Sequence, residues 1–600
     1  MDPITAIDAF SKNGDLLYCV GQQINNRKLL LNLCLVSKCF NKVFSVFLYK
    51  ELWFCERNYH WLFQEDRLSL LLANERLKHV KALSFAAYQD TYQPLYKPFF
   101  GPGRVVLCYA EITEAEACEA FNEGVVRLLR EIPYLESFSW LGYPLFKATL
   151  STVYRQCQRL RNLAIVYPSN LDLMLGQKLG DQADLLPEPE LWAPLNRRWE
   201  IPNLPPFRNL NQLHIHNMWG RHLERWRKMI TVILVNSPGL SDLGFSLSTS
   251  TRCRDLDPEW HDDLKVLHPA HFLRELCRAY ARAGGKPLDL QRLHLGHYMF
   301  VLRRDLNPKG LRPQFPDERQ NGGCLDKLAN LSQLKDLSLD LVGDGEIYLE
   351  VYSDSDDNNS GDNNSDNIIQ SWWQTAPGPL PKLEKLSVRR PTTWLARWAK
   401  GIVREGTPLR QLKVNQADKR CLEYAEKSEL EASWSDLLDC RPQELLLHGH
   451  ADGVVNLDRV MAAGDSIRLL AMTSWEIRDF VECVASQMPK LEGIWIMEPD
   501  DFYDGWLGEP ADIQERKTKW AETVQVAARV CPTLKCFRVA SITWRIVRMA
   551  TEIYLHELDR MENEREIPEL FQISLPYSFD MAHAAKYWVK NRRREKDDLI

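Results

Sequence analysis

Apolar residues recur along most of the chain in a short unit, L-x-x-L-x-L, in which other apolar residues also fill the apolar positions. The last three positions alternate between apolar and variable residues, and this period of two is typical of a β-strand with one buried face. The copies begin at Val80, Leu135, Leu160, Leu210, Leu240, Leu290, Leu334, Leu383, Leu409, Ile467, Leu491 and Leu534, and a weaker copy begins at Pro442. The pattern predicts a strand in each copy.

Proline precedes five of these copies at the same place, at Pro133, Pro238, Pro381, Pro489 and Pro532. Four of the five follow a helical pattern, over residues 125–132, 226–235, 477–488 and 520–530. Because proline cannot continue a helix and favours extended backbone before it, each unit is predicted to run from helix to proline to strand. Several spacings, such as that from Leu135 to Leu160, fall in the 20–29 residues that are usual for leucine-rich repeats.

A unit of this kind cannot bury its own apolar face, so the units are expected to stack on one another. We therefore predict an irregular α/β leucine-rich-repeat solenoid over residues 61–575, with the strands on its concave wall. An acidic, polar stretch at about 351–367 is predicted to be a disordered insertion, because it has almost no apolar side chains to bury. Residues 576–600 are expected to form a C-terminal tail with a small basic cluster.

The N-terminal region has a different pattern, which predicts three short helices over residues 15–49. Asp15 stands where the dipole of the first helix favours a negative charge, and Asn25 and Asn26 separate the first helix from the second. Residues 29–36 are apolar nearly all round, which is typical of a helix that is contacted on more than one side. The segment either caps the following domain or binds another protein, and the pattern alone leaves both open.

The stretch KLLLNLCLVSKCF, from Lys28 to Phe40, resembles the core of the F-box, in which a leucine-rich helix leads into V-[S/C]-[K/R]-x-[W/F]. The continuation LYKELWF, from Leu48 to Phe54, is similar to the segment that follows the F-box in many fungal members. The resemblance implies an all-helical F-box module within residues 1–60 that binds a Skp-family adaptor and, through it, cullin. The residues implied in adaptor binding are Leu16, Leu17, Leu30, Leu31, Val36 and Phe40. The usual L-P-x-E opening is replaced by Lys12-Asn13-Gly14-Asp15.

Composition narrows the class of protein. The fractions of 45% apolar, 10% aromatic and 26% charged residues are those of a folded soluble protein, and the net charge of -6 gives no reason to expect a nucleic-acid partner. The 15 cysteines are scattered without a repeated C-x-x-C pattern, so they are interpreted as mostly buried thiols in a reducing compartment. Without a signal-peptide pattern or an 18-residue apolar run, we expect a cytoplasmic or nuclear protein with no membrane association.

No catalytic motif is found. The chain has no phosphate-loop sequence, no G-x-S-x-G and no H-E-x-x-H, so neither an enzyme nor a cofactor is expected. The pairs His214/His216 and His448/His450 have the H-x-H spacing that places two rings on one face of a strand, but zinc needs further ligands. Both pairs fall on predicted strands, so contact with a partner or simple exposure is preferred over metal binding.

The variable strand positions would face the concavity and form a substrate surface. The candidates on this wall are His214, His216, His294, Arg389, Lys413, His448, Trp495 and Arg538, and Trp495 is expected to be an apolar anchor. The sequence thus predicts a non-catalytic substrate receptor of an SCF-type ubiquitin ligase, which binds the adaptor with its F-box and a protein substrate with its repeats. The alternative is a leucine-rich-repeat interaction scaffold with no ligase association.

Overall fold

A computed structural model describes residues 13–24, 27–55, 59–62, 64–86, 115–141, 145–167, 204–218, 223–247, 272–296, 325–340, 380–389, 399–401, 409–416, 436–449, 457–473, 481, 487–497, 510–539, 542–549 and 552–558. The chain forms two compact units. The first comprises Met1–Ile215, Asp559–Glu566 and Met581–Ile600, and the second comprises His216–Leu558 and Ile567–Asp580. The acidic insertion predicted at 351–367 and the tail predicted at 576–600 lie outside the described residues.

The fold is mixed α/β, with a long, mostly parallel sheet whose strands follow one another in sequence order and which does not close. The strands of the first unit are β1 (Glu51–Cys55), β2 (Ala82–Ala86), β3 (Ser137–Leu141) and β4 (Asn162–Val166), and β5 (Gln212–Met218) contains the boundary between the units. The strands of the second unit are β6 (Asp242–Leu247), β7 (Arg292–Leu295), β8 (Asp336–Asp340), β9 (Lys385–Arg389), β10 (Gln411–Gln416), β11 (Glu444–Gly449), β12 (Leu469–Thr473), β13 (Gly493–Met497), β14 (Cys536–Val539), β15 (Ile542–Met549) and β16 (Glu552–Glu557).

Every predicted copy of the apolar unit coincides with a strand, from β2 to β14. Within the first unit, β1 to β4 pair in parallel, and within the second, β6 to β14 also pair in parallel. The apolar positions stand in register on neighbouring strands, as Leu386, Leu412 and Leu445 illustrate, and all three side chains are buried. The prediction of a strand in each copy is therefore confirmed.

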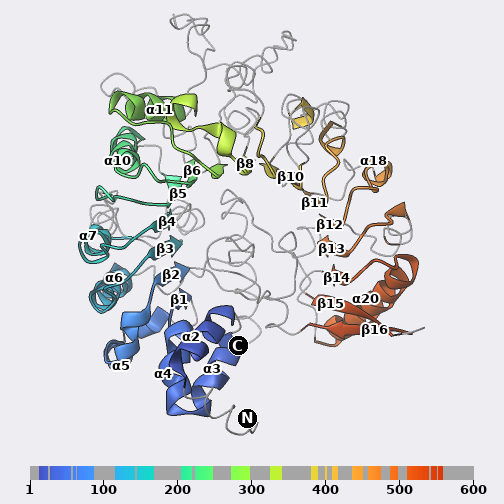
Figure 1. The fold of residues 1–600 in the computed structure, drawn as a ribbon, viewed down its shortest axis with the longest axis horizontal. Helices are drawn as coiled ribbons and strands as arrows, with labels where there is room; N and C mark the ends of the chain where they lie inside the picture. Colours follow the sequence, from blue (N-terminus) through green and yellow to red (C-terminus); the bar gives the residue numbers. More distant parts are fainter. Residues whose placement is uncertain are drawn as a thin grey trace, which may run out of the picture. The chain divides into compact units, whose positions relative to one another are not determined.

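Helices accompany the strands. Those of the first unit are α2 (Gly14–Gln23), α3 (Arg27–Val36), α4 (Lys38–Leu48), η1 (Tyr59–Leu62), α5 (Glu65–Leu72), η2 (Glu75–His79), α6 (Ala115–Arg130) and α7 (Lys147–Gln156). Those of the second are α10 (Leu223–Val235), α11 (Phe272–Arg282), α12 (Leu325–Leu328), η10 (Leu331–Gln333), α18 (Leu457–Ala462) and α20 (Pro510–Val530). Helices from successive copies pack side by side, α6 on α7 in the first unit and α10 on α11 in the second (Figure 1).

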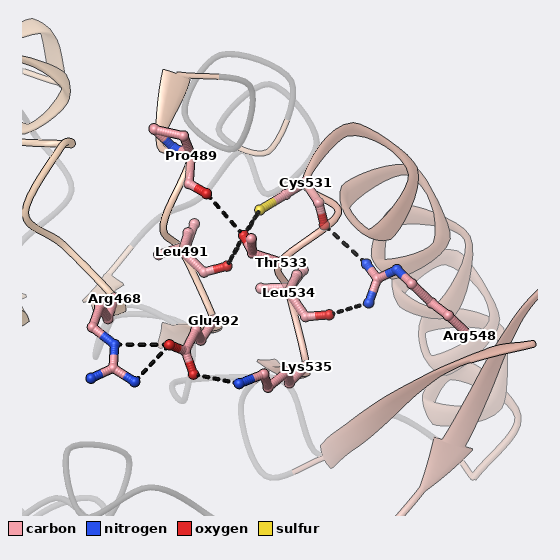
Figure 2. Close-up of polar contacts among 9 residues, drawn as sticks. All are labelled: Arg468, Pro489, Leu491, Glu492, Cys531, Thr533, Leu534, Lys535 and Arg548. Carbon is pink, nitrogen blue, oxygen red and sulfur yellow. Dashed lines mark hydrogen bonds and ion pairs between the residues drawn. The ribbon is translucent and has the colours of Figure 1, made fainter.

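The turn that contains proline links successive copies in the second unit. At the step from β13 to β14, the Thr533 hydroxyl donates to the Leu491 carbonyl at 2.8 Å, and the Cys531 thiol lies 3.4 Å from the same oxygen (Figure 2). On the exposed side of this step, Glu492 accepts from both Arg468 and Lys535 at 2.8 Å. These contacts fasten the turn before β14 to the turn before β13, since a proline-containing turn has fewer backbone donors of its own.

The last two strands differ from the prediction. Residues up to about 575 were expected to continue the parallel array, but β14 to β16 pair in an antiparallel direction. Arg548 of β15 reaches the end of α20, where its guanidinium donates to the carbonyls of Cys531 and Leu534 (Figure 2). It also donates to the carbonyl of Ala528 within the last turn of α20. These oxygens include the acceptors that a helix leaves unpaired at its C-terminus. The antiparallel strands therefore end the parallel series.

Candidate functional site

The N-terminal module is built around a small core. The three predicted helices are present as α2, α3 and α4, and their core contains Leu17, Leu30, Cys34 and Phe44. Asn13 begins α2, since its side chain accepts from the amides of Asp15 and Leu16 at 3.1 and 3.2 Å. Ser37 begins α4 in the same way through the amide of Phe40.

Glycine is required at one position of this module. A Cβ built on Gly21 of α2 would stand 2.4 Å from a ring carbon of Phe47 on α4. The absence of a side chain therefore allows α2 to approach α4 closely, and Tyr18 packs against the same ring with the two ring centroids 4.9 Å apart. The close packing of α2 on α4 leaves the other faces of the module for solvent or a partner.

Large aliphatic side chains are exposed on the two outer helices of the module. On α3, Leu35 is 76% exposed, Val36 64% and Leu31 48%, and on α2 Leu16 is 48% exposed. Further exposed apolar residues are Tyr18, Val20 and Leu29. Leu31 and Leu35 are four residues apart and so share one face of α3. We call these seven side chains the α2–α3 surface.

The six side chains predicted to bind an adaptor divide into three groups. Leu16, Leu31 and Val36 belong to the α2–α3 surface. Leu17 and Leu30 are buried, 1% and 5% exposed, because they fill the core of the module, so neither belongs to the α2–α3 surface. Phe40 is half-buried and packs against Phe44, with the two ring centroids 5.4 Å apart. Leu35 was missed, although its spacing of four from Leu31 was visible in the sequence.

The first outward-facing positions of β6 to β11 form a row of mostly charged side chains in the second unit. Register pairs Asp242, Arg292, Asp336, Lys385, Gln411 and Glu444 in that order. Arg292 Nη2 lies 2.8 Å from Asp242 Oδ2, and Gln411 Nε2 donates to Glu444 Oε2 at 2.6 Å. Opposite charges on neighbouring strands attract one another, so this charged row stabilises the register.

Asp336 lies in the middle of the charged row. Partial burial raises the pKa of its carboxyl group, and the nearby positive charges of Lys385, Lys413 and Arg292 oppose that effect. The net direction is upward, because removing a carboxylate from water costs more here than its cationic neighbours return. The cationic neighbours thus offset only part of the cost of burying Asp336.

The predicted substrate wall is mostly covered in the structure. His214, His216, Lys413, Trp495 and Arg538 are buried, so the expectation that they are exposed is wrong. His294 is half-buried. The backbones of Arg389 and His448 belong to β9 and β11, but their side chains lie outside the described residues. Sequence periodicity placed these positions on strands, but it does not record whether distant parts of the chain bury them.

Two sets of contacts show how several of these buried side chains find partners. His216 Nδ1 lies 3.1 Å from Ser246 Oγ, and the His216 ring meets the His294 ring edge-on at 5.1 Å. Trp495 and Arg538 are paired in register on β13 and β14, and the Arg538 guanidinium carbon is 4.4 Å from the centroid of the Trp495 ring. A buried guanidinium gains energy from the face of an aromatic ring, so Trp495 stabilises a charge instead of forming an exposed anchor.

The described residues contain neither a cluster of metal ligands nor a membrane-spanning helix. Across those ranges, no group of three or more His, Cys, Asp or Glu side chains could hold a metal ion. Within the same ranges, no helix combines the length and apolar character needed to span a membrane.

Burial raises the pKa of the Cys157 and Cys440 thiols to about 12, so both are protonated near neutral pH.

Comparison with known proteins adds no assignment. The sequence matches no protein-family model, and it matches no curated protein.

Proposed function

We propose that this chain is the substrate-recognition subunit of an SCF-type ubiquitin ligase. In this proposal residues 13–49 form an F-box that binds a Skp-family adaptor, and the remaining strands and helices form an irregular leucine-rich-repeat solenoid that holds a protein substrate. The chain itself performs no chemistry. It raises the effective concentration of substrate lysines near a ubiquitin carrier that the adaptor and cullin bring in.

The exposed aliphatic side chains of α3 are the observation that carries the proposal. Leu31, Leu35 and Val36 stand in solvent although the module has a formed core of its own. Burying a leucine or valine side chain gains about 1.5–3 kcal/mol, so several on one short helix favour a protein partner. The F-box resemblance of residues 28–40 names the partner as an adaptor of the Skp family.

The parallel sheet supports the second part of the proposal. Strand order follows sequence order, the strands in each unit pair in parallel up to β14, and a helix precedes several of them. This succession is what stacked leucine-rich repeats require. Repeat proteins of this kind bind other proteins along the strand face, which in the second unit is polar at β7, β8 and β9.

Co-expression with a Skp-family adaptor tests the proposal. The double variant Leu35→Asp, Val36→Asp should reduce adaptor binding by at least about 100-fold, because burying two unpaired carboxylates costs several kcal/mol. Both side chains are exposed, so the free variant should fold as the wild type does. Leu70→Asp is the matched control, since Leu70 is 69% exposed on α5, outside the module, and should leave binding unchanged.

Three results would overturn the receptor assignment. They are no complex with the wild-type chain, equal binding by the double variant, or equal loss in the Leu70 control. The first result favours an interaction scaffold without ligase association. One observation already favours that second candidate, because α2 begins at Asn13 and Gly14 and lacks the L-P-x-E opening that F-boxes usually have.

A further inference from the structure

The helical module joins the sheet through a very short connection. Helix α4 ends at Leu48 and β1 begins at Glu51, so only Tyr49 and Lys50 lie between them. Strand β1 pairs with β2 along its whole length, from Glu51 opposite Ala82 to Cys55 opposite Ala86. This strand was expected to lie inside an all-helical module. Its pairing makes the sheet begin immediately after α4, so little backbone remains to bend between them.

A single arginine adds a second connection at the same place. Arg76 belongs to η2, which immediately precedes β2, and its Nη2 donates to Asn41 Oδ1 on α4 at 2.5 Å. Its guanidinium carbon also lies 5.4 Å from the ring centroid of Tyr49, the residue that caps the C-terminus of α4. Arg76 therefore contacts α4 near both of its ends.

Asn41 extends this connection to the third helix. Its Nδ2 donates to the carbonyl of Cys34 at 3.0 Å, in the last turn of α3. That end of a helix carries a partial negative charge, which a nearby guanidinium stabilises. The positive charge of Arg76 also acts on the Cys34 thiol. Burial raises the pKa of this thiol, and Arg76 partly opposes that rise. The geometry and the electrostatics thus agree that Arg76 lies close to both α3 and α4.

The arginine is itself held in place. Asn74 accepts from the backbone amide of Arg76 through its side-chain oxygen at 3.1 Å, which begins η2. The side chain is half-buried, which already restricts its rotamers. Contact with both Asn41 and Tyr49 therefore costs little additional conformational entropy. Lys78 lies two residues further along η2 and is exposed, which provides a matched position for comparison.

We infer that Arg76 is a positioning residue that fixes the orientation of the helical module relative to β1 and β2. The fixed orientation means that the exposed side chains of α3 keep a constant direction relative to β1 and β2. The consequence for ubiquitin transfer rests on the proposed function: an adaptor bound to this surface would hold the carrier at a constant distance from the first strands. The connection itself, in contrast, is a property of the free chain.

Distance measurement in the full-length free chain tests the inference. Spin labels on non-natural amino acids at Gln22 of α2 and Arg130 of α6, both exposed, report the separation of the module from the helices beside the sheet. The wild type should give one narrow distance distribution. Arg76→Ala should broaden it, Lys78→Ala should leave it unchanged, and Arg76→Lys should give an intermediate width, because lysine keeps the charge but lacks the planar fork.

Adaptor affinity separates positioning from folding. In Arg76→Ala the affinity should stay within about twofold of the wild type, because the contact residues on α3 are independent of the connection. An unchanged distance distribution in Arg76→Ala would overturn the inference, and so would a loss of helical structure in the module. If the wild-type chain binds no adaptor, the proposed function fails, whereas the distance distributions still decide whether Arg76 fixes the orientation.

Discussion

The helical module and the strand face distribute polarity in opposite ways. In the module, aliphatic side chains such as Leu35 and Val36 are exposed. On the strand face, polar and charged side chains such as His216, Lys413 and Arg538 are buried. In most proteins apolar side chains are buried and charged ones are exposed. A buried charge therefore needs a polar or aromatic partner, and an exposed apolar cluster gains from being covered.

The source of that compensation differs between the two regions. On the strand face it comes from the chain itself, since Arg292 lies against Asp242, Gln411 against Glu444 and Arg538 over Trp495. In the module, Leu35 and Val36 of α3 remain 76% and 64% exposed. A protein partner would therefore bury the most apolar surface at the module. On the strand face, many polar side chains already have partners within the chain.

The largest expected effect separates the core of the module from its surface. Phe44→Ala should destabilise the module by about 3–5 kcal/mol, because a fully buried phenylalanine leaves a cavity. Leu35→Ala should change stability by less than about 0.5 kcal/mol and, under the proposed function, should weaken adaptor binding. Chemical denaturation followed by circular dichroism measures both. A destabilisation by Leu35→Ala similar to that of Phe44→Ala would mean that the α2–α3 surface is structural.

A smaller effect is expected at the end of the parallel series. Arg548→Ala removes a guanidinium that donates to three carbonyls at the end of α20, and it should cost about 1–3 kcal/mol. Lys535→Ala breaks an exposed pair with Glu492 and should cost about 0.2–1 kcal/mol. Hydrogen exchange of α20 should rise in the first variant and not in the second. Equal exchange in the two variants would show that Arg548 does not hold this end of the helix.

The smallest expected effect is a pH dependence in the charged row. Because the folded pKa of Asp336 lies above its ordinary value of 3.8, the folded state favours the protonated form. The contribution of Asp336 to stability is therefore complete below that ordinary value and is lost as the pH rises through the raised pKa. Asp336→Asn removes this dependence, so its stability relative to the wild type should increase with pH. Denaturation curves at several pH values above 3.8 measure the difference, and a flat or falling difference would contradict it.

Local sequence signals were sufficient to locate the helices and strands and their order along the chain. Alternation of apolar residues located strands β2 to β14, and the prolines located the starts of several turns, because both signals act within a few residues. The three helices of the module were equally visible. The module was predicted to present Leu16, Leu31 and Val36, and these side chains are exposed.

Only the tertiary structure decided which faces are covered. Leu17 and Leu30 have the same character as Leu16 and Leu31 in the sequence, but the packing of α2, α3 and α4 buries the first pair. The antiparallel direction of β15 and the meeting of Arg76 with Asn41, 35 residues apart, likewise left no local signal. Periodicity records which residues share a face, whereas burial depends on segments that are distant along the chain, and a pattern of a few residues carries no information about them.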